Sequence, residues 1–249
     1  QVPVGHVEAG LRTYDKYSPF PEEMNRKLVS AIADLYFCPT VNNRSNLLKE
    51  GITQGLFVTG NTVIDALKTT VREDYQFSTE VLNHLPYGEK KIILVTCHRR
   101  ENYGTPMAHI MTALRRVADA FPDVELVYPV HLSPVVQEAA HQYLDGHPRI
   151  HLIAPLAVDE MHNLMARCYL IMTDSGGLQE EAPSLGKPVL VLRRETERPE
   201  AIEAGTVKLA GVEQANIVKL ARELFDDEDA YAKMAHAVNP YGDGKTSQR

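Results

Sequence analysis

The sequence predicts an α/β fold built on parallel β-sheets. Short runs rich in β-branched residues recur along the chain, each run ends in a polar or glycine-containing turn, and a helical pattern follows the turn. This alternation is typical of βα units, whose strands pair in parallel. The expected strands are residues 2–7, 35–39, 56–59, 91–96, 125–130, 151–152, 169–173 and 189–192.

The first of these strands, residues 2–7, reads as a buried strand already under way. No helix or strand precedes it to supply a pairing partner, and a parallel sheet normally buries its strands between neighbours. We therefore expect the natural N-terminus of the protein to lie outside this sequence.

Helical patterns fill the gaps between the strands. Pro21 followed by Glu22 and Glu23 predicts a helix start, because proline suits the first helical position and acidic side chains suit the positive end of the helix dipole. The segment 79–90 lacks strong periodicity, and we expect a domain junction between Leu67 and Lys90.

Composition narrows the class of protein. The 26 Lys and Arg against 33 Asp and Glu give a formal net charge of -7, which disfavours nucleic acid or an anionic membrane as a partner. Cys38, Cys97 and Cys168 are scattered without CxxC spacing, so neither a disulfide framework nor a metal site is indicated. No apolar run is long enough to span a bilayer, and no signal-like leader opens the chain. We expect a cytoplasmic protein in which any anionic ligand meets a local cluster of arginines.

The carboxyl ends of parallel strands are where such sheets bind ligands. After the predicted strand 169–173, a turn containing Ser175, Gly176 and Gly177 leads into a helix. Free backbone N–H groups in this turn would face an anion, and glycine lets a diphosphate approach closely. Glu181, one turn into the helix, could accept both ribose hydroxyls. The alternative is a tight βα turn without a ligand, and the absence of a GxGxxG motif gives no indication of NAD.

Basic side chains follow the neighbouring strands. His98 and Arg99 come directly after the strand 91–96, where an arginine can grip phosphate in bidentate fashion and a histidine can donate to a departing phosphate oxygen. The alternative is a solvated turn. His131, at the end of the strand 125–130, is interpreted on its own as a structural histidine.

Three further cations, Arg193, Arg194 and Arg198, follow the last predicted strand. In an acidic protein they place positive charge near the sheet edge that carries the glycine-containing turn. We expect these arginines to help hold an anion at that edge.

Acidic residues gather in the early part of the chain. His6 and Glu8 are expected on one side of an extended segment, because strand side chains alternate, and Arg12 follows closely. Glu22 and Glu23 sit in the first turn of the predicted helix. Each acid taken singly suits an ordinary surface position. Because they occur together, in a chain whose later part is predicted to bind phosphate, they are acid/base candidates.

Two other motifs are excluded. The run GDGKT at residues 242–246 invites a P-loop interpretation, but the first glycine of GxxxxGK[ST] would fall at Asn239, and no strand and helix flank the run. No GxSxG is present, so a serine-hydrolase nucleophile elbow is absent.

These segments together closely resemble the bacterial non-hydrolysing UDP-N-acetylglucosamine 2-epimerases. The family's stretches are found at 6–13 (HVEAGLRT), 19–26 (PFPEEMNR), 60–65 (GNTVID), 98–102 (HRREN), 174–183 (DSGGLQEEAP), 196–201 (TERPEA) and 239–244 (NPYGDG). They span the whole chain in the family's order, so the resemblance is highly specific.

The resemblance implies a GT-B-type α/β fold, in which two Rossmann-like domains with parallel sheets hold a nucleotide sugar between them. It implies a remnant of the N-terminal domain at 1–67, the C-terminal UDP-binding domain at 68–220, and a helical segment at 221–249 that returns to the N-terminal domain. The N-terminal domain is then incomplete, because roughly the first third of the family's chain is missing, and with it a catalytic aspartate and basic residues.

The resemblance also implies a reaction, the reversible epimerisation at C2 of UDP-N-acetylglucosamine to UDP-N-acetylmannosamine. This isomerase activity serves bacterial cell-envelope polysaccharide biosynthesis and proceeds by elimination of UDP to 2-acetamidoglucal, followed by re-addition. Glu8 and Glu22 match the acid/base residues, and His98 matches the histidine beside the diphosphate. No metal or other cofactor is required. A hydrolysing 2-epimerase and a GT-B glycosyltransferase are the alternatives.

The family's remaining site residues can also be placed on this chain. The implied UDP-sugar contacts are His98, Met161, Ser175, Gly176, Gly177, Glu181 and Arg198. Arg99 and His131 are implied as contacts of an allosteric UDP-sugar. Met161 departs from the aromatic residue that many relatives carry near the uracil, although methionine is apolar and adaptable enough to pack there. The family implies a homodimer when full length, and we expect a chain of this length to be inactive alone.

Overall fold

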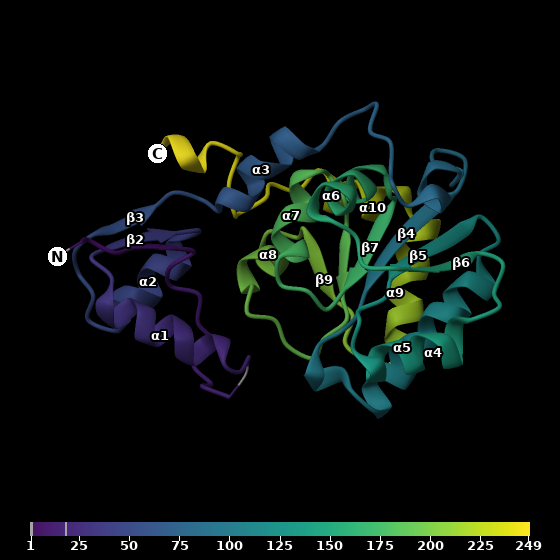
Figure 1. Ribbon diagram of the computed structural model, residues 1–249, viewed down its shortest axis with the longest axis horizontal. Coiled ribbons are helices and arrows are strands. Elements are labelled where there is room, and N and C mark those ends of the chain that lie inside the picture. The colour runs from purple at the N-terminus through teal and green to yellow at the C-terminus, as the bar shows by residue number, and fades with distance from the viewer. Residues whose placement is uncertain (1, 18) are drawn as a thin grey trace. The chain divides into compact units, whose positions relative to one another are not determined.

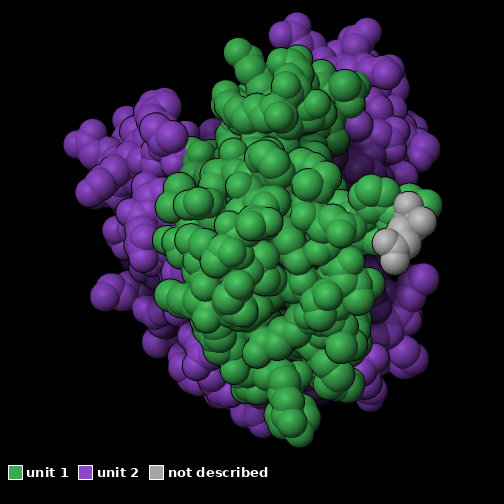
Figure 2. All heavy atoms as spheres, turned by 90° about the vertical axis from the view of Figure 1, so that its left-hand side faces the viewer, with its two compact units in different colours: residues 1–69, 239–249 green, residues 70–238 purple. Residues whose placement is uncertain are grey.

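The chain forms two compact units, which the computed structural model describes over residues 2–17 and 19–249. Unit 1 comprises residues 1–69 and 239–249, and unit 2 comprises residues 70–238 (Figure 2). Residues 221–238 thus belong to unit 2, and the last residues, 239–249, belong to unit 1. The boundaries 1–67, 68–220 and 221–249 that the sequence suggests for the domains of the family stay a prediction.

Unit 1 is a small α/β unit. Its described elements are β1 (Gly5–Val7), α1 (Glu22–Ile32), β2 (Leu35–Cys38), α2 (Val41–Lys49), β3 (Leu56–Val58), α3 (Thr62–Thr70), whose last residue belongs to unit 2, and the 3-10 turn η3 (Thr246–Gln248) (Figure 1). The three described strands pair in parallel in the order β1-β2-β3. Helix α1 begins at Glu22 after Pro21, as the sequence predicts.

The core of unit 1 is small. Ala9, Tyr36, Cys38 and Leu47 form one buried cluster. Val7, Leu35 and Phe57 are among the exposed apolar side chains of the three strands. Burial of apolar surface is the main stabilising term in folding, so these exposed strand residues contribute little of it.

Unit 2 is a larger α/β unit whose residues are all described. Its elements in order are η1 (Glu80–Asn83), β4 (Lys91–Thr96), η2 (Arg100–Asn102), α4 (Thr105–Ala120), β5 (Val124–Pro129), α5 (Pro134–Leu144), β6 (Ile150–Ile153), α6 (Val158–Arg167), β7 (Leu170–Thr173), α7 (Leu178–Ser184), β8 (Val189–Val191), α8 (Pro199–Glu203), β9 (Val207–Leu209), α9 (Gln214–Asp226) and α10 (Glu228–Ala235). The strand β9 corresponds to none of the strands expected from the sequence.

The strands of unit 2 form one parallel sheet of six in the order β6-β5-β4-β7-β8-β9. The chain therefore starts at the centre with β4, winds outward to β6, returns to β7 beside β4, and winds outward the other way. This is the strand order of a doubly wound Rossmann sheet, and the reversal between β4 and β7 is its topological switch point. Ligands of such sheets bind outside the carboxyl ends of the strands at that point.

Helices cover both faces of this sheet. Ile93 and Val95 of β4 belong to the main core cluster with residues of α4, α5 and α9, and α6 contacts β4 while α7 contacts β7 and β8 (Figure 1). All residues of β4 after Lys91 are buried, so both faces of the strand are covered. This explains why central strands read as continuous apolar runs instead of alternating ones.

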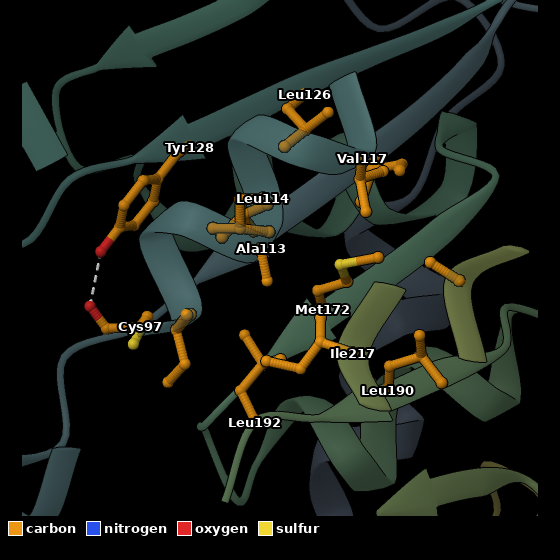
Figure 3. Close-up of a cluster of buried hydrophobic side chains, with 14 of the residues drawn as sticks. Cys97, Ala113, Leu114, Val117, Leu126, Tyr128, Met172, Leu190, Leu192 and Ile217 are labelled. Atoms are coloured by element: carbon orange, nitrogen blue, oxygen red, sulfur yellow. Dashed lines mark hydrogen bonds between the residues drawn. The ribbon is translucent and has the colours of Figure 1, made fainter. Parts of the chain in front are cut away.

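Tyr128 of β5 connects the buried core of unit 2 to the carboxyl edge of the sheet, the edge at which sheets of this type bind ligands. Its ring lies among buried apolar side chains such as Leu114 of α4, and its hydroxyl donates to the backbone oxygen of Cys97 at 2.6 Å (Figure 3). A buried tyrosine needs such an acceptor, because an unpaired hydroxyl in an apolar core is costly. The bond fixes the backbone immediately before His98.

Candidate functional site

The turn after β4 is organised by one buried carboxylate at the end of β7. The Oδ2 atom of Asp174 accepts hydrogen bonds from the backbone N–H of His98 at 2.8 Å, from that of Arg99 at 2.8 Å, and from the Asn102 side chain at 3.1 Å. Asp174 is fully buried. Charge-assisted bonds of this kind are about twice as strong as neutral ones, so the turns after β4 and β7 are tied into a single structure at the switch point.

His98 lies in this turn with a half-buried ring. Its Nδ1 atom is 3.5 Å from Oδ1 of Asp174, and its ring stacks on that of His131 with centroids 5.2 Å apart. Burial lowers the pKa of His98 below the usual histidine value, Asp174 opposes this, and the neighbouring His131 and Arg99 lower the pKa further. These surroundings favour the neutral form of the imidazole more than those of an ordinary exposed histidine do.

His131, which the sequence alone suggests is structural, is therefore a neighbour of His98. Its Nδ1 atom accepts the backbone N–H of Ser133 at 3.1 Å, so the side chain carries its proton on Nε2 in this arrangement. The residue is exposed. Arg99 is half-buried, and its Nε atom is buried without a hydrogen-bond partner among the described residues. This arginine has donors available for a ligand.

The glycine-containing turn follows β7 beside the same edge. Ser175 and Gly177 are partly exposed, whereas Gly176 is buried. A Cβ atom at Gly176 would lie 2.5 Å from Nη1 of Arg198, so only glycine leaves room for the guanidinium. The structure thus shows a second reason for glycine at position 176, besides the approach of a phosphate. The absence of a side chain there leaves room for Arg198 beside the turn.

The arginines after β8 differ from the sequence expectation. Arg198 donates to Glu180 at 2.5 Å and to Glu197 at 2.7 Å, and Arg193 donates to Glu197 and to Glu101, each at 2.6 Å. Two of the three cations expected to hold an anion are therefore already paired with carboxylates, because buried charges require partners. The third, Arg194, is exposed.

Glu197 is the centre of this buried network. Burial alone would raise the pKa of Glu197, but the charges of Arg198 and Arg193 outweigh it and lower the pKa to about 2. The carboxylate is thus ionised at all physiological pH values. The network holds Arg198 beside the glycine-containing turn.

Glu181 and Met161 lie on neighbouring helices of unit 2. Glu181, on α7, is partly exposed, and its Oε2 atom is 3.2 Å from Nε2 of the buried His162. The other carboxylate oxygen, Oε1, lies 3.1 Å from the position that a Cβ atom at Gly177 would take. Met161 precedes His162 on α6 and is half-buried. The structure therefore brings Glu181 to the glycine-containing turn.

Glu8 lies in unit 1, directly after β1. It has φ of 60°, so it has left the extended conformation, and the expected alternation that would place His6 and Glu8 on one side of a strand does not hold. Its side chain is exposed and accepts a hydrogen bond from Nδ2 of Asn61 at 3.0 Å. Positive φ in a residue other than glycine costs free energy and is often found at functional positions.

Glu22 and Glu23 are adjacent but have different surroundings. Glu23 is fully buried and accepts the backbone N–H groups of Thr13 at 3.2 Å and Tyr14 at 3.0 Å, so it fixes the preceding loop. Glu22 is exposed, and within the described part of the chain no hydrogen bond or ion pair engages it. Of the two, Glu22 is the one whose carboxylate is available to exchange a proton. Arg12 is buried and is bonded to Glu50 through Nε at 2.8 Å, which is a structural role.

The C-terminal segment explains two of the sequence motifs. The backbone N–H of Asn61 donates to the oxygen of Tyr241 at 2.7 Å, and the carboxylate of Asp65 accepts the N–H groups of Thr246 at 3.0 Å and Ser247 at 2.8 Å. Burial would raise the pKa of Asp65, but the bonds from Ser247 and Thr246 lower it to about 2. The run GDGKT therefore binds to α3 and does not form a phosphate-binding loop. The side chain of Lys68, on α3, donates to the backbone oxygens of Asp243 and Gly244.

Asp174 and His162 are among the residues of this region that received no role from the sequence. Asp174 lay inside a recognised motif, and its position directly after a buried strand was a usable signal. His162 gave none, since a histidine within a helix has no distinctive pattern. Within unit 2, His98, Arg99 and His131 are brought together in one group, and Ser175, Gly176, Gly177 and Arg198 in another.

Comparison with known proteins assigns the chain to a family. The family model described as UDP-N-acetylglucosamine 2-epimerase matches residues 1–249. The UDP-N-acetylglucosamine 2-epimerase of Bacillus subtilis is 59% identical over 250 residues, so the chain, matched over 100% of its length, spans 65% of that relative.

Solved structures support the same family assignment. The S. aureus MnaA–UDP co-structure has a TM-score of 0.94 and 55% identity, covering 100% of this chain and 67% of that one. The UDP-GlcNAc 2-epimerase of Neisseria meningitidis bound to UDP-GlcNAc has a TM-score of 0.93 and 45% identity, covering 99% and 68%. These neighbours are of the GT-B type, which confirms the fold class predicted from the sequence. By family model, sequence and fold, the chain belongs to the UDP-N-acetylglucosamine 2-epimerase family.

Proposed function

We propose that the whole protein interconverts UDP-N-acetylglucosamine and UDP-N-acetylmannosamine without net hydrolysis. The observation that carries this proposal lies at the switch point of unit 2. There Asp174 ties the turn holding His98 and Arg99 to the turn holding Ser175 and Gly177, at the place where Rossmann sheets bind nucleotides. Family membership supplies the substrate class, a UDP-sugar.

The chemistry proceeds by elimination and re-addition. C2 of the sugar has no neighbouring carbonyl that would acidify its hydrogen, so direct epimerisation through a carbanion would be too costly. Instead a carboxylate takes the C2 proton while the C1–O bond breaks, its electron pair leaves with UDP, and a C1=C2 double bond forms. The product, 2-acetamidoglucal, then receives a proton on the opposite face of C2 as the diphosphate oxygen rejoins C1.

Glu8 and Glu22 are the proposed acid/base pair. Both side chains are exposed, Glu22 is unengaged by any described residue, and Glu8 is oriented by the amide of Asn61. Glu23, the other carboxylate nearby, is excluded because two backbone N–H groups already occupy it. A carboxylate that exchanges a proton must be able to change its charge without breaking the fold.

His98 and the residues around it are the proposed site of the leaving UDP. The lowered pKa of His98 leaves the imidazole neutral before binding, so the arriving diphosphate can draw a proton onto it and the resulting cation stabilises the departing charge. Gly176 and Gly177 would offer backbone N–H groups to phosphate. Ser175, whose own N–H already donates to Oγ1 of Thr173 at 2.9 Å, would contact the phosphate through its hydroxyl, and Arg198 would add charge from its buried network.

The remaining contacts are assigned by position. Glu181 would accept the ribose hydroxyls and Met161 would pack near the uracil. Arg99, with its unpartnered Nε, and the exposed His131 are proposed to contact a second, regulatory UDP-sugar. We further propose that the whole protein is a cytoplasmic homodimer. No helix within residues 2–17 and 19–249 has the length and apolar character needed to cross a membrane.

Product identification tests the proposal. The whole protein is incubated with UDP-N-acetylglucosamine, and the products are separated. Formation of UDP-N-acetylmannosamine supports the proposed reaction, free N-acetylmannosamine with UDP would show a hydrolysing epimerase instead, and transfer of sugar to an added acceptor would show a glycosyltransferase.

The chain of 249 residues is a separate case. We propose that it binds UDP weakly through unit 2 and does not epimerise. Exchange of the C2 proton in deuterated water, measured with the purified chain, checks this directly. Detectable exchange would show that all essential acid/base groups lie within these residues.

A further inference from the structure

Side chains of helix α6 form hydrogen bonds with the first residues of unit 2. The side chain of Asn163, fully buried, accepts the backbone N–H of Arg72 at 2.8 Å and donates to the backbone oxygen of Thr70 at 2.8 Å. One helical turn away, Oε1 of Glu160 accepts the N–H and hydroxyl of Ser78 at 2.8 and 2.9 Å. The segment 70–79 is thus held along α6 by side chains that reach its backbone.

His162, next to Asn163, also contacts the segment 70–79, and it contacts helix α7 as well. Its side chain is 4% exposed, its Nδ1 atom lies 2.7 Å from Oγ1 of Thr70, and its Nε2 atom lies 3.2 Å from Oε2 of Glu181. The ring therefore spans from α7 to Thr70, the residue at which the chain passes from unit 1 to unit 2. Helices α6 and α7, which carry the two side chains, are neighbours in Figure 1.

The direction of the bonds follows from the carboxylate. An ionised carboxylate can only accept hydrogen bonds, so the contact is favourable when Nε2, the ring nitrogen 3.2 Å from Oε2 of Glu181, carries the ring proton. The opposite nitrogen then meets Thr70, whose hydroxyl can accept or donate and so satisfies either protonation state of the ring. With the hydroxyl of Thr70 at one ring nitrogen and Glu181 within 3.2 Å of the other, the ring is confined between α7 and Thr70.

We infer that His162, itself held by Thr70, is a positioning residue that fixes the carboxylate of Glu181 for ribose recognition. This inference rests on the proposed function, in which Glu181 accepts the ribose hydroxyls. A glutamate has several rotatable bonds, and a partly exposed one loses rotamer freedom when it must meet a ligand in one geometry. His162 holds Oε2 before the ligand arrives, which leaves Oε1, beside Gly177, directed at the glycine-containing turn.

Fixing a group before binding increases affinity by reducing the ordering cost of binding, and it increases selectivity for a ligand that uses that group. The measurable signature is therefore the preference for UDP over 2′,3′-dideoxy-UDP, which lacks both ribose hydroxyls. A purely structural role of His162 in packing α6 would lower the affinity for both nucleotides alike and leave their ratio unchanged.

The test measures both nucleotides by calorimetry with the whole protein and four variants. We expect the unmodified protein to prefer UDP by about tenfold or more, and Glu181→Ala to lose most of that preference. Thr70→Val keeps the shape of the side chain and removes only its hydroxyl, so we expect the preference to fall to about threefold or less with dideoxy-UDP binding unchanged. Thr70→Ser restores the hydroxyl and should restore the preference.

Ser78→Ala is the matched control, because it also removes one hydroxyl from the segment that α6 fastens, but at Glu160 instead of His162. We expect it to keep the preference for UDP. If Ser78→Ala and Thr70→Val reduce the preference equally, the segment acts only by its general stability and the inference is overturned. The same conclusion follows if Thr70→Val leaves the preference intact.

Failure of the proposed function gives a different result. If Glu181 does not contact ribose, the unmodified protein and Glu181→Ala show the same ratio of affinities, whatever Thr70→Val does. A preference that is lost in Glu181→Ala but kept in Thr70→Val overturns the positioning role alone.

Discussion

The two units differ most in how their strands are covered. In unit 2 the central strands β4 and β5 are six residues long, and every residue of β5 is buried. In unit 1 the strands β1 and β3 are three residues long, and Val7, Phe57 and Val58 are exposed. Unit 2 therefore has the more completely buried sheet. In unit 1, hydrogen bonds such as those between Asp65 and the C-terminal segment join elements that are distant in sequence.

The candidate residues differ in the same way. In unit 2 the carboxylates near the sheet edge are occupied: Glu197 by two arginines, Asp174 by backbone N–H groups and Glu181 by His162. In unit 1 Glu22 has no described partner and Glu8 has one neutral donor. Groups that recognise a ligand benefit from being fixed in advance, and groups that exchange protons must be able to change charge.

Hydrogen exchange should give the largest contrast between the units. Because unit 1 has a small core and exposed strands, we expect amides in residues 1–67 to be less protected than those in 91–192, by about 10³-fold for the best-protected strands of each. Exchange followed by mass spectrometry on the chain measures this. Equal protection of β2 and β5 would show that unit 1 is as stable as unit 2 despite its exposed apolar surface.

Removal of the acid/base groups should give the next largest effect. Glu8→Gln and Glu22→Gln keep the size of the side chain but not its charge, so turnover of the whole protein should fall by about 10² or more while UDP affinity changes little. Glu138→Gln, an exposed carboxylate on α5, is the matched control and should leave turnover unchanged. Near-normal turnover in either test variant would remove that residue from the mechanism.

Changes in the recognition groups of unit 2 should affect binding instead of turnover alone. Glu181→Ala should weaken UDP binding by about tenfold, which corresponds to roughly 1.4 kcal/mol. Arg198→Ala should weaken it as well, but that change also removes the buried guanidinium that donates to Glu180 and Glu197 and is expected to destabilise unit 2. Arg198→Lys keeps the charge and separates the two effects when binding and thermal unfolding are measured together. Unchanged affinity in all three variants would place the nucleotide elsewhere.

The pH dependence of UDP binding should give the smallest effect. Burial lowers the pKa of His98 in the unliganded protein, and a bound diphosphate raises it again, so binding takes up a proton and affinity falls as pH rises through the interval between these two pKa values. We expect a change of a few fold between about pH 6 and pH 8. Calorimetry in buffers of different ionisation enthalpy measures the proton uptake.

His98→Gln is the reference for this measurement, because UDP itself also titrates, with a phosphate pKa of about 6. Subtracting the variant's proton uptake leaves the contribution of His98. The same uptake in both proteins would mean that the histidine does not sense the diphosphate.

The sequence by itself determined the parallel α/β class, most of the strands and the segments that lie at their carboxyl ends. Strand residues such as those of β4 are selected locally, by the requirement that both faces be buried, and this leaves a continuous apolar run that can be read directly. Since parallel strands end at a common edge, the order of the motifs was enough to place His98 and Gly177 at the ends of strands in one sheet.

Only the tertiary structure decided which charges are paired. Arg193 and Arg198 looked like cations for a ligand, yet buried guanidinium groups need carboxylates, and those came partly from residues far away in sequence, such as Glu101. Thr70 and His162 are separated by 92 positions and meet because α6 packs along the start of unit 2. Such partners are chosen by packing between distant elements, and no local pattern of residues records that choice.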